Sequence, residues 1–237
     1  KPCTIALYGS GARRTVKGGT GSGEVNSRYF ITIEQGLEDA GFTVTTKDWL
    51  DAYDTVVTEA HKAFIQEIRE RAKKKHVFAV MEGMGAIMPE PEYDLPIKVQ
   101  GDTAIYVLAR ISGEGADRKN ESGDILLSAS ERRDILRLND AYENFMLVLN
   151  VGGPVDLTPV KDVKNILVLS QLGAETGNTF ADLILGKSYP SGKLSTTWAT
   201  EADYPGFGTF GETNDTRYEE GVYVGYRYFD AANKMPL

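Results

Sequence analysis

The amino-acid sequence predicts an α/β fold, a three-layer α/β/α sandwich around a mostly parallel sheet of about five or six strands. Two observations carry this prediction. Short apolar runs of the kind that is buried in parallel sheets recur along the chain. Segments with helical spacing separate them, and strands joined through helices need right-handed crossovers that make neighbouring strands parallel. No internal repeat or low-complexity linker interrupts the pattern, so we expect one domain over residues 1–237.

The expected strands share short runs of aliphatic, aromatic or β-branched residues. They are 4–9, 42–46, 103–110, 145–153 and 165–173, with 193–199 as a possible last strand. The runs 145–153 and 165–173 are of the kind expected for buried strands.

Four segments with helical spacing lie between or after these strands, namely 29–40, 54–75, 128–142 and 174–185. Gly41 and Gly186 stand where glycine caps belong. Ser128 and Glu131 have the spacing of a capping box, in which each side chain satisfies a backbone donor at the helix start. The segment 77–99 has no regular period and is expected to cross the surface as an irregular excursion.

Composition excludes several classes of partner. The formal net charge of -8 and the pI near 4.9 argue against nucleic acid and anionic membrane surfaces, because phosphates would be repelled. Cys3 is the only cysteine, which excludes an internal disulfide and a thiolate metal site. His61 and His76 lack a paired carboxylate motif, so no metal site is expected. No cofactor is expected, and the oligomeric state cannot be inferred.

The ends of the chain suggest that it is a piece of a longer polypeptide. It opens directly on a strand pattern without a signal peptide and stops at "KMPL". No stretch is apolar enough to span a bilayer. The compartment is unknown on this evidence, with the cytoplasm slightly favoured.

Two loops follow strand patterns and could carry chemistry, because ligands in such folds bind at the carboxyl ends of the strands. The first is "KGGTGSGE", residues 17–24, whose glycines let the backbone approach a ligand closely. It fits neither the dinucleotide fingerprint nor the Walker A spacing, and neither does "GKS" at 186–188. The alternative is that this loop is only a flexible connection.

The second loop is "ISGEGADR", residues 111–118, in which glycines flank Glu114. Free rotation on both sides of Glu114 would let its carboxylate project away from the sheet. Asp117 and Arg118 are expected to form a local ion pair that stiffens the turn. The alternative is an ordinary solvated, charged loop. A Ser-His-Asp triad is excluded, because neither histidine follows a strand pattern.

Seven pieces of the sequence, taken in order, resemble the second, α/β-sandwich domain of glycoside hydrolase family 3, the β-glucosidase group. They are "IALYGSG", "KGGTGSGEV", "GLEDAGFTV", "AIYVLARISGEGADR", "VLNVGGPVDL", "ILVLSQLGAETGNTFADLILGKSYPSGKLSTTW" and "YEEGVYVGYRYFD". Together they cover most of the chain outside the stretch around 49–100. The family ends this domain with a strand of the type "FGYGLSYT", and the present sequence stops before it.

The resemblance implies that Glu114 is the general acid/base of a retaining, exo-acting β-glycosidase that hydrolyses O-glycosidic bonds. A glutamate against apolar surface in a closed cleft has a raised pKa and can donate a proton near neutral pH. Retaining enzymes hold a second carboxylate about 5–5.5 Å away as nucleophile. In the family that aspartate lies on a separate N-terminal barrel domain, in a motif ending Ser-Asp-Trp that this chain lacks. The chain alone is therefore expected to be inactive.

For the glycine loop, the resemblance implies that Ser22 hydrogen-bonds the sugar in the first subsite and that Gly19 and Thr20 line the entrance. The expected partners are a β-linked oligosaccharide or glucoside and the barrel domain of the same polypeptide. Sugar and linkage remain open. The alternative from another class is a non-catalytic, flavodoxin-like module that binds a ligand or a partner domain.

Overall fold

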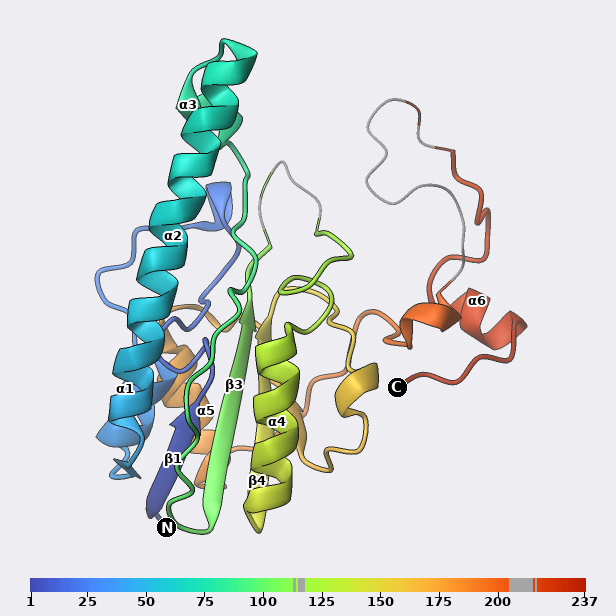
Figure 1. Cartoon of the computed structure of the whole chain (residues 1–237). Helices are drawn as coiled ribbons and strands as arrows, with labels where there is room; N and C mark the ends of the chain where they lie inside the picture. The colour runs from blue at the N-terminus through green and yellow to red at the C-terminus, as the bar shows by residue number, and fades with distance from the viewer. Residues whose placement is uncertain (113, 115–117, 205–214, 216) are drawn as a thin grey trace.

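A parallel five-stranded sheet forms the centre of the part of the chain that the structure describes (Figure 1). The structure is a computed structural model that describes residues 1–112, 114, 118–204, 215 and 217–237, without the side chains of Ser22 and Glu201. The strand order is β2-β1-β3-β4-β5, and every neighbouring pair is parallel. The strands are β1 (Thr4–Tyr8), β2 (Thr43–Val44), β3 (Thr103–Arg110), β4 (Asn144–Val151) and β5 (Ile166–Val168).

Helices cover both faces of this sheet (Figure 1). On one face lie α1 (Ile33–Asp39) and α5 (Thr176–Ile184), and on the other lie α2 (Lys47–Lys75) and α4 (Ala129–Ala141). Helices α1 and α5 contact each other through glycines. A Cβ placed on Gly36 of α1 would lie 2.2 Å from the carbonyl carbon of Gly177 in α5. The predicted α/β/α sandwich with a mostly parallel sheet of about five or six strands is confirmed, and the sheet has five strands in the described residues.

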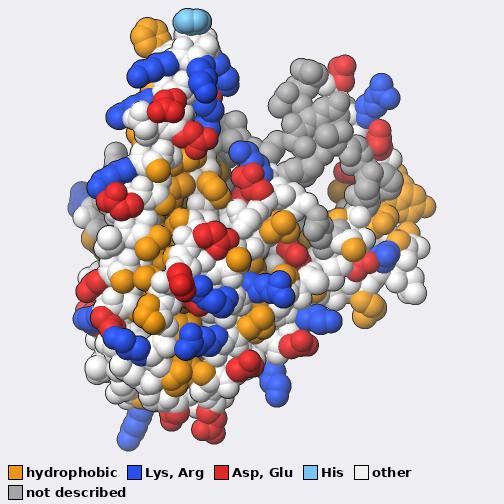
Figure 2. All heavy atoms as spheres, viewed as in Figure 1, with side chains coloured by type: hydrophobic (Ala, Val, Ile, Leu, Met, Phe, Trp, Pro, Cys, Tyr) orange, Lys and Arg blue, Asp and Glu red, His pale blue; other side chains and the backbone are white. Residues whose placement is uncertain are grey.

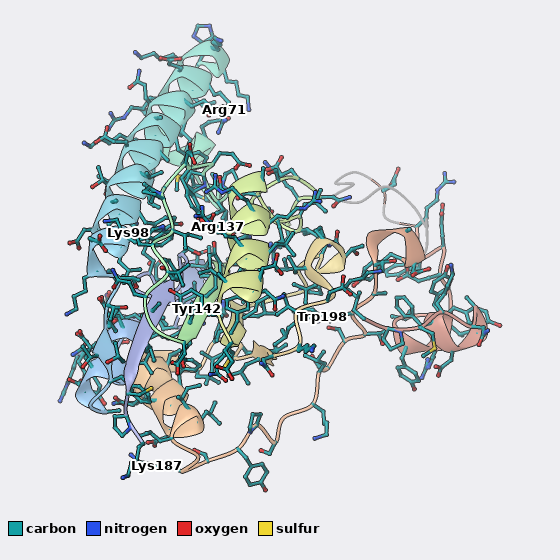
Figure 3. All side chains as sticks on the ribbon, turned by 60° about the horizontal axis from the view of Figure 1, so that its bottom comes forward. Arg71, Lys98, Arg137, Tyr142, Lys187 and Trp198 are labelled. Carbon is teal, nitrogen blue, oxygen red and sulfur yellow. The ribbon has the colours of Figure 1, made fainter. Side chains whose placement is uncertain are left out.

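Shorter elements connect these layers. They are η1 (Gly21–Gly23), α3 (Ala79–Glu82), η2 (Thr158–Val160), η3 (Gly173–Glu175), η4 (Glu201–Asp203) and α6 (Tyr226–Ala231). In the C-terminal part, the N–H of Leu237 donates to the carbonyl of Trp198 at 2.9 Å, and the rings of Tyr204 and Phe229 meet edge to face. Trp198, labelled in Figure 3, therefore joins the end of the chain to the segment that leaves the sandwich.

The predicted helix ends are largely confirmed by their local chemistry. The Ser128 hydroxyl accepts from the N–H of Glu131 at 3.1 Å, and the Glu131 carboxylate accepts from the N–H of Ser128 at 2.8 Å. Gly41 has a φ of 93°, in the left-handed region that favours glycine. Basic residues fill the last turn of α2, where they complement the helix dipole, and they colour its upper end blue in Figure 2.

Several sequence predictions differ from the structure, three of them as follows. The helix α2 begins at Lys47, seven residues before the predicted start, because Trp49, Leu50 and Tyr53 continue its buried face. The helix predicted over 29–40 begins only at Ile33, after the cap Thr32. The strand predicted over 193–199 is wrong, since this described segment forms no strand and Leu194 is exposed. Its apolar residues pack only at its end, where Trp198 is buried.

None of the helices in the described part of the chain combines the length and the apolar character needed to cross a membrane.

Candidate active site

The two loops selected from the sequence meet at the carboxyl edge of the sheet. The N–H of Thr20 donates to the carbonyl oxygen of Ser112 at 3.0 Å, and the Thr20 hydroxyl donates to the same oxygen at 3.4 Å. A Cβ on Gly19 would lie 3.1 Å from that carbonyl oxygen. The glycine loop therefore rests directly on the chain that leaves β3, two residues before Glu114.

Glu114 lies against the glycine loop. Gly21 has a φ of 77°, and a Cβ at this position would lie 2.5 Å from both the Cβ and the Oε2 of Glu114. Real side chains do not approach so closely, so the contact requires a glycine at position 21. Glu114 itself is exposed at this edge. The structure thus brings Gly19, Thr20 and Glu114 together.

Ser22 and two members of the acidic loop cannot be placed as fully. The backbone of Ser22 lies in η1, and its side chain is outside the described residues. Asp117 is also outside them, so the predicted ion pair with Arg118 stays a prediction. The Nε of Arg118 pairs with the carboxylate of Asp124, which also accepts from the N–H of Lys119 at 2.6 Å. This contact fixes the described end of the loop.

Asn150 holds the glycine loop in place from the other side of the sheet edge. Its side chain is fully buried at the end of β4. The amide oxygen accepts from the N–H of Val16 at 2.6 Å, and the amide nitrogen donates to the carbonyls of Val16 at 2.9 Å and Ser170 at 2.7 Å. We call these three hydrogen bonds the Asn150 clamp. Next to them, the N–H of Gly173 donates to the carbonyl of Lys17 at 3.0 Å. The loops after β1, β3, β4 and β5 therefore form one hydrogen-bonded edge.

Comparison with known proteins identifies the family. The model of the glycosyl hydrolase family 3 C-terminal domain matches residues 1–226. The chain belongs to this family.

Relatives of this family 3 domain are β-glucosidases. Beta-glucosidase A of Butyrivibrio fibrisolvens is 33% identical over 258 residues, which cover 97% of this chain and 29% of that relative. A beta-glucosidase of Ruminococcus albus is 30% identical over 230 residues, covering 92% of this chain and 22% of that relative. The solved structure of beta-glucosidase 3B from Thermotoga neapolitana in complex with alpha-D-glucose has a TM-score of 0.74 and 32% identity, and the match covers 98% of this chain and 33% of that chain. The chain spans about a third or less of these relatives.

Sequence reasoning missed Asn150 in the family 3 domain. The available signal was a single polar residue inside the apolar run "FMLVLNVGG", separated by one valine from two glycines. A buried amide in such a position needs hydrogen-bond partners, and here they are the backbone groups of the neighbouring loops. Gly152 continues this packing, since a Cβ there would lie 3.0 Å from the Ser112 hydroxyl and 2.8 Å from the Nε2 of Gln171.

A buried ion pair supports the carboxyl end of β3. Arg110 donates to both carboxylate oxygens of Glu131, at 2.8 and 2.6 Å, and to the carbonyl of Asp124 at 2.8 Å. Burial alone would lower the pKa of Arg110, but the Glu131 carboxylate more than offsets this, so the pKa of Arg110 is raised. The pair connects the capping box of α4 to the strand that leads to Glu114.

Metal ligands do not gather in the described residues. No group of three or more His, Cys, Asp or Glu side chains there could hold a metal ion.

Proposed function

We propose that this domain supplies the general acid/base, Glu114, to a retaining, exo-acting β-glucosidase-like glycoside hydrolase. The observation that carries the proposal is the contact between Glu114 and Gly21, which places a carboxyl group beside a backbone-lined loop at the carboxyl edge of the sheet. Family membership and the β-glucosidase relatives support it. The barrel domain that would complete the site is proposed to belong to the same polypeptide.

In the first step, the Glu114 carboxyl group donates its proton to the glycosidic oxygen while the bond from that oxygen to the sugar breaks. A carboxylate from the barrel domain forms the covalent bond to the sugar carbon, as retaining enzymes require. In the second step, the Glu114 carboxylate takes a proton from the water that attacks the same carbon, and the bond from that carbon to the barrel carboxylate breaks, which releases the sugar and restores the free carboxylate. The first step leaves Glu114 ionised, as the second step requires, and the second step leaves it protonated, as the first step requires.

The glycine loop is proposed to bind the sugar around this reaction. Ser22 would hydrogen-bond the sugar in the first subsite, and Gly19 and Thr20 would line the entrance. The hydrogen bonds from Thr20 to Ser112 support this arrangement, because they fix the loop relative to the acid/base segment. Thr20 is too small to supply an aromatic platform at the entrance, so such a platform would have to come from another residue.

The decisive experiment uses Glu114→Ala in the full-length protein, with two β-glucosides of poor and good leaving groups. The poor substrate should lose roughly 10²–10⁴-fold in kcat/KM, and the good one far less, because a stable leaving group needs little protonation. Added azide should partly restore turnover of the good substrate. The control is Glu143→Ala, which changes an exposed acid at the opposite edge of the sheet. It should alter kcat/KM for neither substrate.

Equal losses on both substrates without azide rescue would refute the role of Glu114 and favour a non-catalytic binding module. The isolated 237-residue chain should hydrolyse no aryl β-glucoside, because it carries the acid without the nucleophile.

A further inference from the structure

A hollow of about 880 Å³ opens beside the carboxyl ends of β1 and β3. We call it the switch-point hollow and define it by α2, the segment 84–91 and the segment 119–124, with Ser10 and Ile111 at the strand ends. The segment after α3 passes between α2 and β3 and so forms one wall (Figure 1). The sheet order reverses at β1, and open α/β sheets bind ligands where the strand order reverses. The volume is that of a small-molecule site.

The walls of the switch-point hollow are mostly apolar. Val57, Ala60 and Phe64 face it from α2, and Ile87 and Met88 face it from the opposite segment. Figure 2 shows hydrophobic side chains along this flank of α2. Such walls favour a flat, apolar group over a second sugar, whose hydroxyls would lose their hydrogen bonds to water.

The charged groups around the switch-point hollow are balanced. Each of the four cations on its wall has an acidic partner: Arg14 with Asp54, Arg71 with Glu67, Arg110 with Glu131 and Lys119 with Glu121. Arg71, labelled in Figure 3, comes from the upper part of α2. Among the described residues of the wall, a phosphate would have to displace an acidic side chain from each cation that it bound. The arrangement selects for a neutral ligand.

Glu90 supplies a polar anchor in the wall. Tyr53 donates its hydroxyl hydrogen to Oε1 of Glu90, whereas Oε2 accepts no hydrogen bond from the residues that the structure describes. Burial and the negative charge of Glu131 raise the pKa of Glu90 to about 7, against the opposing effects of Arg110, the Tyr53 hydroxyl and Arg14. One oxygen of this carboxyl group is thus available to a ligand hydroxyl.

We infer that the switch-point hollow binds a neutral aryl alcohol, with its ring between α2 and the segment 84–91 and, in the free alcohol, its hydroxyl group donating to Glu90. The aryl group can arrive as the leaving group of a β-glucoside, in which case its oxygen lies at Glu114 until the glycosidic bond breaks, or as the free alcohol. The first source rests on the proposed function, since the chain passes from Ile111 at the hollow to Glu114 within three residues. The second source does not depend on it.

Direct binding tests the site without turnover. The full-length protein with Glu114→Gln is titrated with 4-ethylphenol by calorimetry, and we expect saturable binding to one site. Ala60→Phe, which places a ring in the hollow, should weaken binding about tenfold or more. Thr58→Phe changes an exposed residue of α2 that does not line the hollow and should have no effect. Equal melting temperatures of the two variants exclude unfolding as the cause.

Glu90→Gln is a second variant that leaves the shape of the wall intact. A phenol donates a stronger hydrogen bond to a carboxylate than to a carboxylic acid. Binding of 4-ethylphenol should therefore tighten about fivefold from pH 6 to pH 8 in the parent, and Glu90→Gln should abolish this change. Absence of saturable binding, or equal binding by the parent and Ala60→Phe, would overturn the inference.

Kinetics separate the two sources of the aryl group. If it is the leaving group, 4-ethylphenol inhibits competitively, and Ala60→Phe raises KM about tenfold for 4-ethylphenyl β-glucoside but not for methyl β-glucoside. If the free alcohol is the ligand, inhibition is not competitive and both KM values are unchanged. A full-length protein that hydrolyses neither glucoside would refute the proposed function, while the calorimetry would still decide the inference about the hollow.

Discussion

The N–H of Thr20 donates a hydrogen bond to the carbonyl of Ser112 at 3.0 Å, although the two residues are 92 positions apart in the chain. This bond joins the glycine loop to the segment that carries Glu114. Both groups belong to the backbone, so most substitutions of Thr20 leave the bond in place.

Proline at position 20 removes the bond with little other change. Thr20 has a φ of -74°, which proline adopts without strain, and the change removes the N–H together with the hydroxyl, whose weaker bond to Ser112 is also lost in the control Thr20→Ala. Thr20→Pro in the full-length enzyme should lower kcat/KM about tenfold with a smaller change in stability of roughly 1 kcal/mol. Thr20→Ala, which keeps the N–H, should stay within about threefold of the parent. Indistinguishable kinetics of the two variants would show that the bond does not position the site.

Gly21→Ala should damage the site far more than Gly23→Ala. Alanine at 21 meets a φ of 77° and places its Cβ 2.5 Å from Glu114, which must move. The backbone strain alone costs about 1–2 kcal/mol. A Cβ at Gly23 meets nothing within 4 Å. We therefore expect kcat/KM for a poor leaving group to fall at least about tenfold only in Gly21→Ala, measured beside the melting temperature of both variants. Similar kinetics of the two would argue against a catalytic position for Glu114.

The pair between Arg110 and Glu131 should behave as a buried unit. Glu131→Gln keeps an acceptor for the N–H of Ser128 but leaves the Arg110 charge without its partner, which should cost about 3–5 kcal/mol in urea unfolding. The double variant Arg110→Met with Glu131→Gln should lose less free energy of unfolding than the sum of the losses in the two single variants. Additive losses would mean that the two side chains are not coupled in the folded protein.

Stability should fall as pH rises through the titration of Glu90. Its folded-state pKa of about 7 lies above the ordinary value of 4.5, so the folded protein binds more protons than the unfolded chain between these values. The free energy of unfolding should therefore decrease from about pH 4.5 to 7, by on the order of 2–3 kcal/mol for this group. Glu90→Gln should remove that contribution, as measured by urea unfolding across this range.

Glu92→Gln provides a control of opposite sign. Burial opposes ionisation of Glu92, but hydrogen bonds from Ser130, Ala129 and Ser122 lower its pKa. The contribution of Glu92 to the free energy of unfolding is therefore present at neutral pH and lost in acid. An unchanged pH slope in Glu90→Gln would contradict the raised pKa of Glu90.

The central part of the fold could be predicted because it rests on local patterns. The limits predicted for the strand at 103–110 agree with β3, and the capping box of Ser128 and Glu131 forms with both hydrogen bonds. Prediction was weaker at the sheet edges. Only Ile166–Val168 of the run 165–173 pairs as a strand, because the chain then turns through Ser170, which has a φ of 58°.

The candidate site could be predicted only in its two loops. Glycines and an acid after strand patterns indicated where ligands could approach, and Thr20 and Glu114 are indeed brought to one edge. The contacts that hold this edge depend on residues far apart in sequence, such as Asn150 and Val16, and no local period reports them. The switch-point hollow could not be predicted from the sequence either, because one of its walls is the irregular segment 84–91, which follows no helix or strand period.

The Asn150 clamp has a consequence for the order in which the protein is made. The glycine loop leaves the ribosome early, but its anchors, Asn150 and Gly173, are synthesised more than 130 residues later. At about 5–20 residues per second, the loop waits for roughly 8–30 s before its last partner exists. During that interval Ser112 is the first partner that the loop can reach, and the bonds of Val16 and Lys17 are still missing. The loop can therefore gain all of its anchors only after translation has passed β5, and a chain that stops earlier holds it through the segment of Glu114 alone.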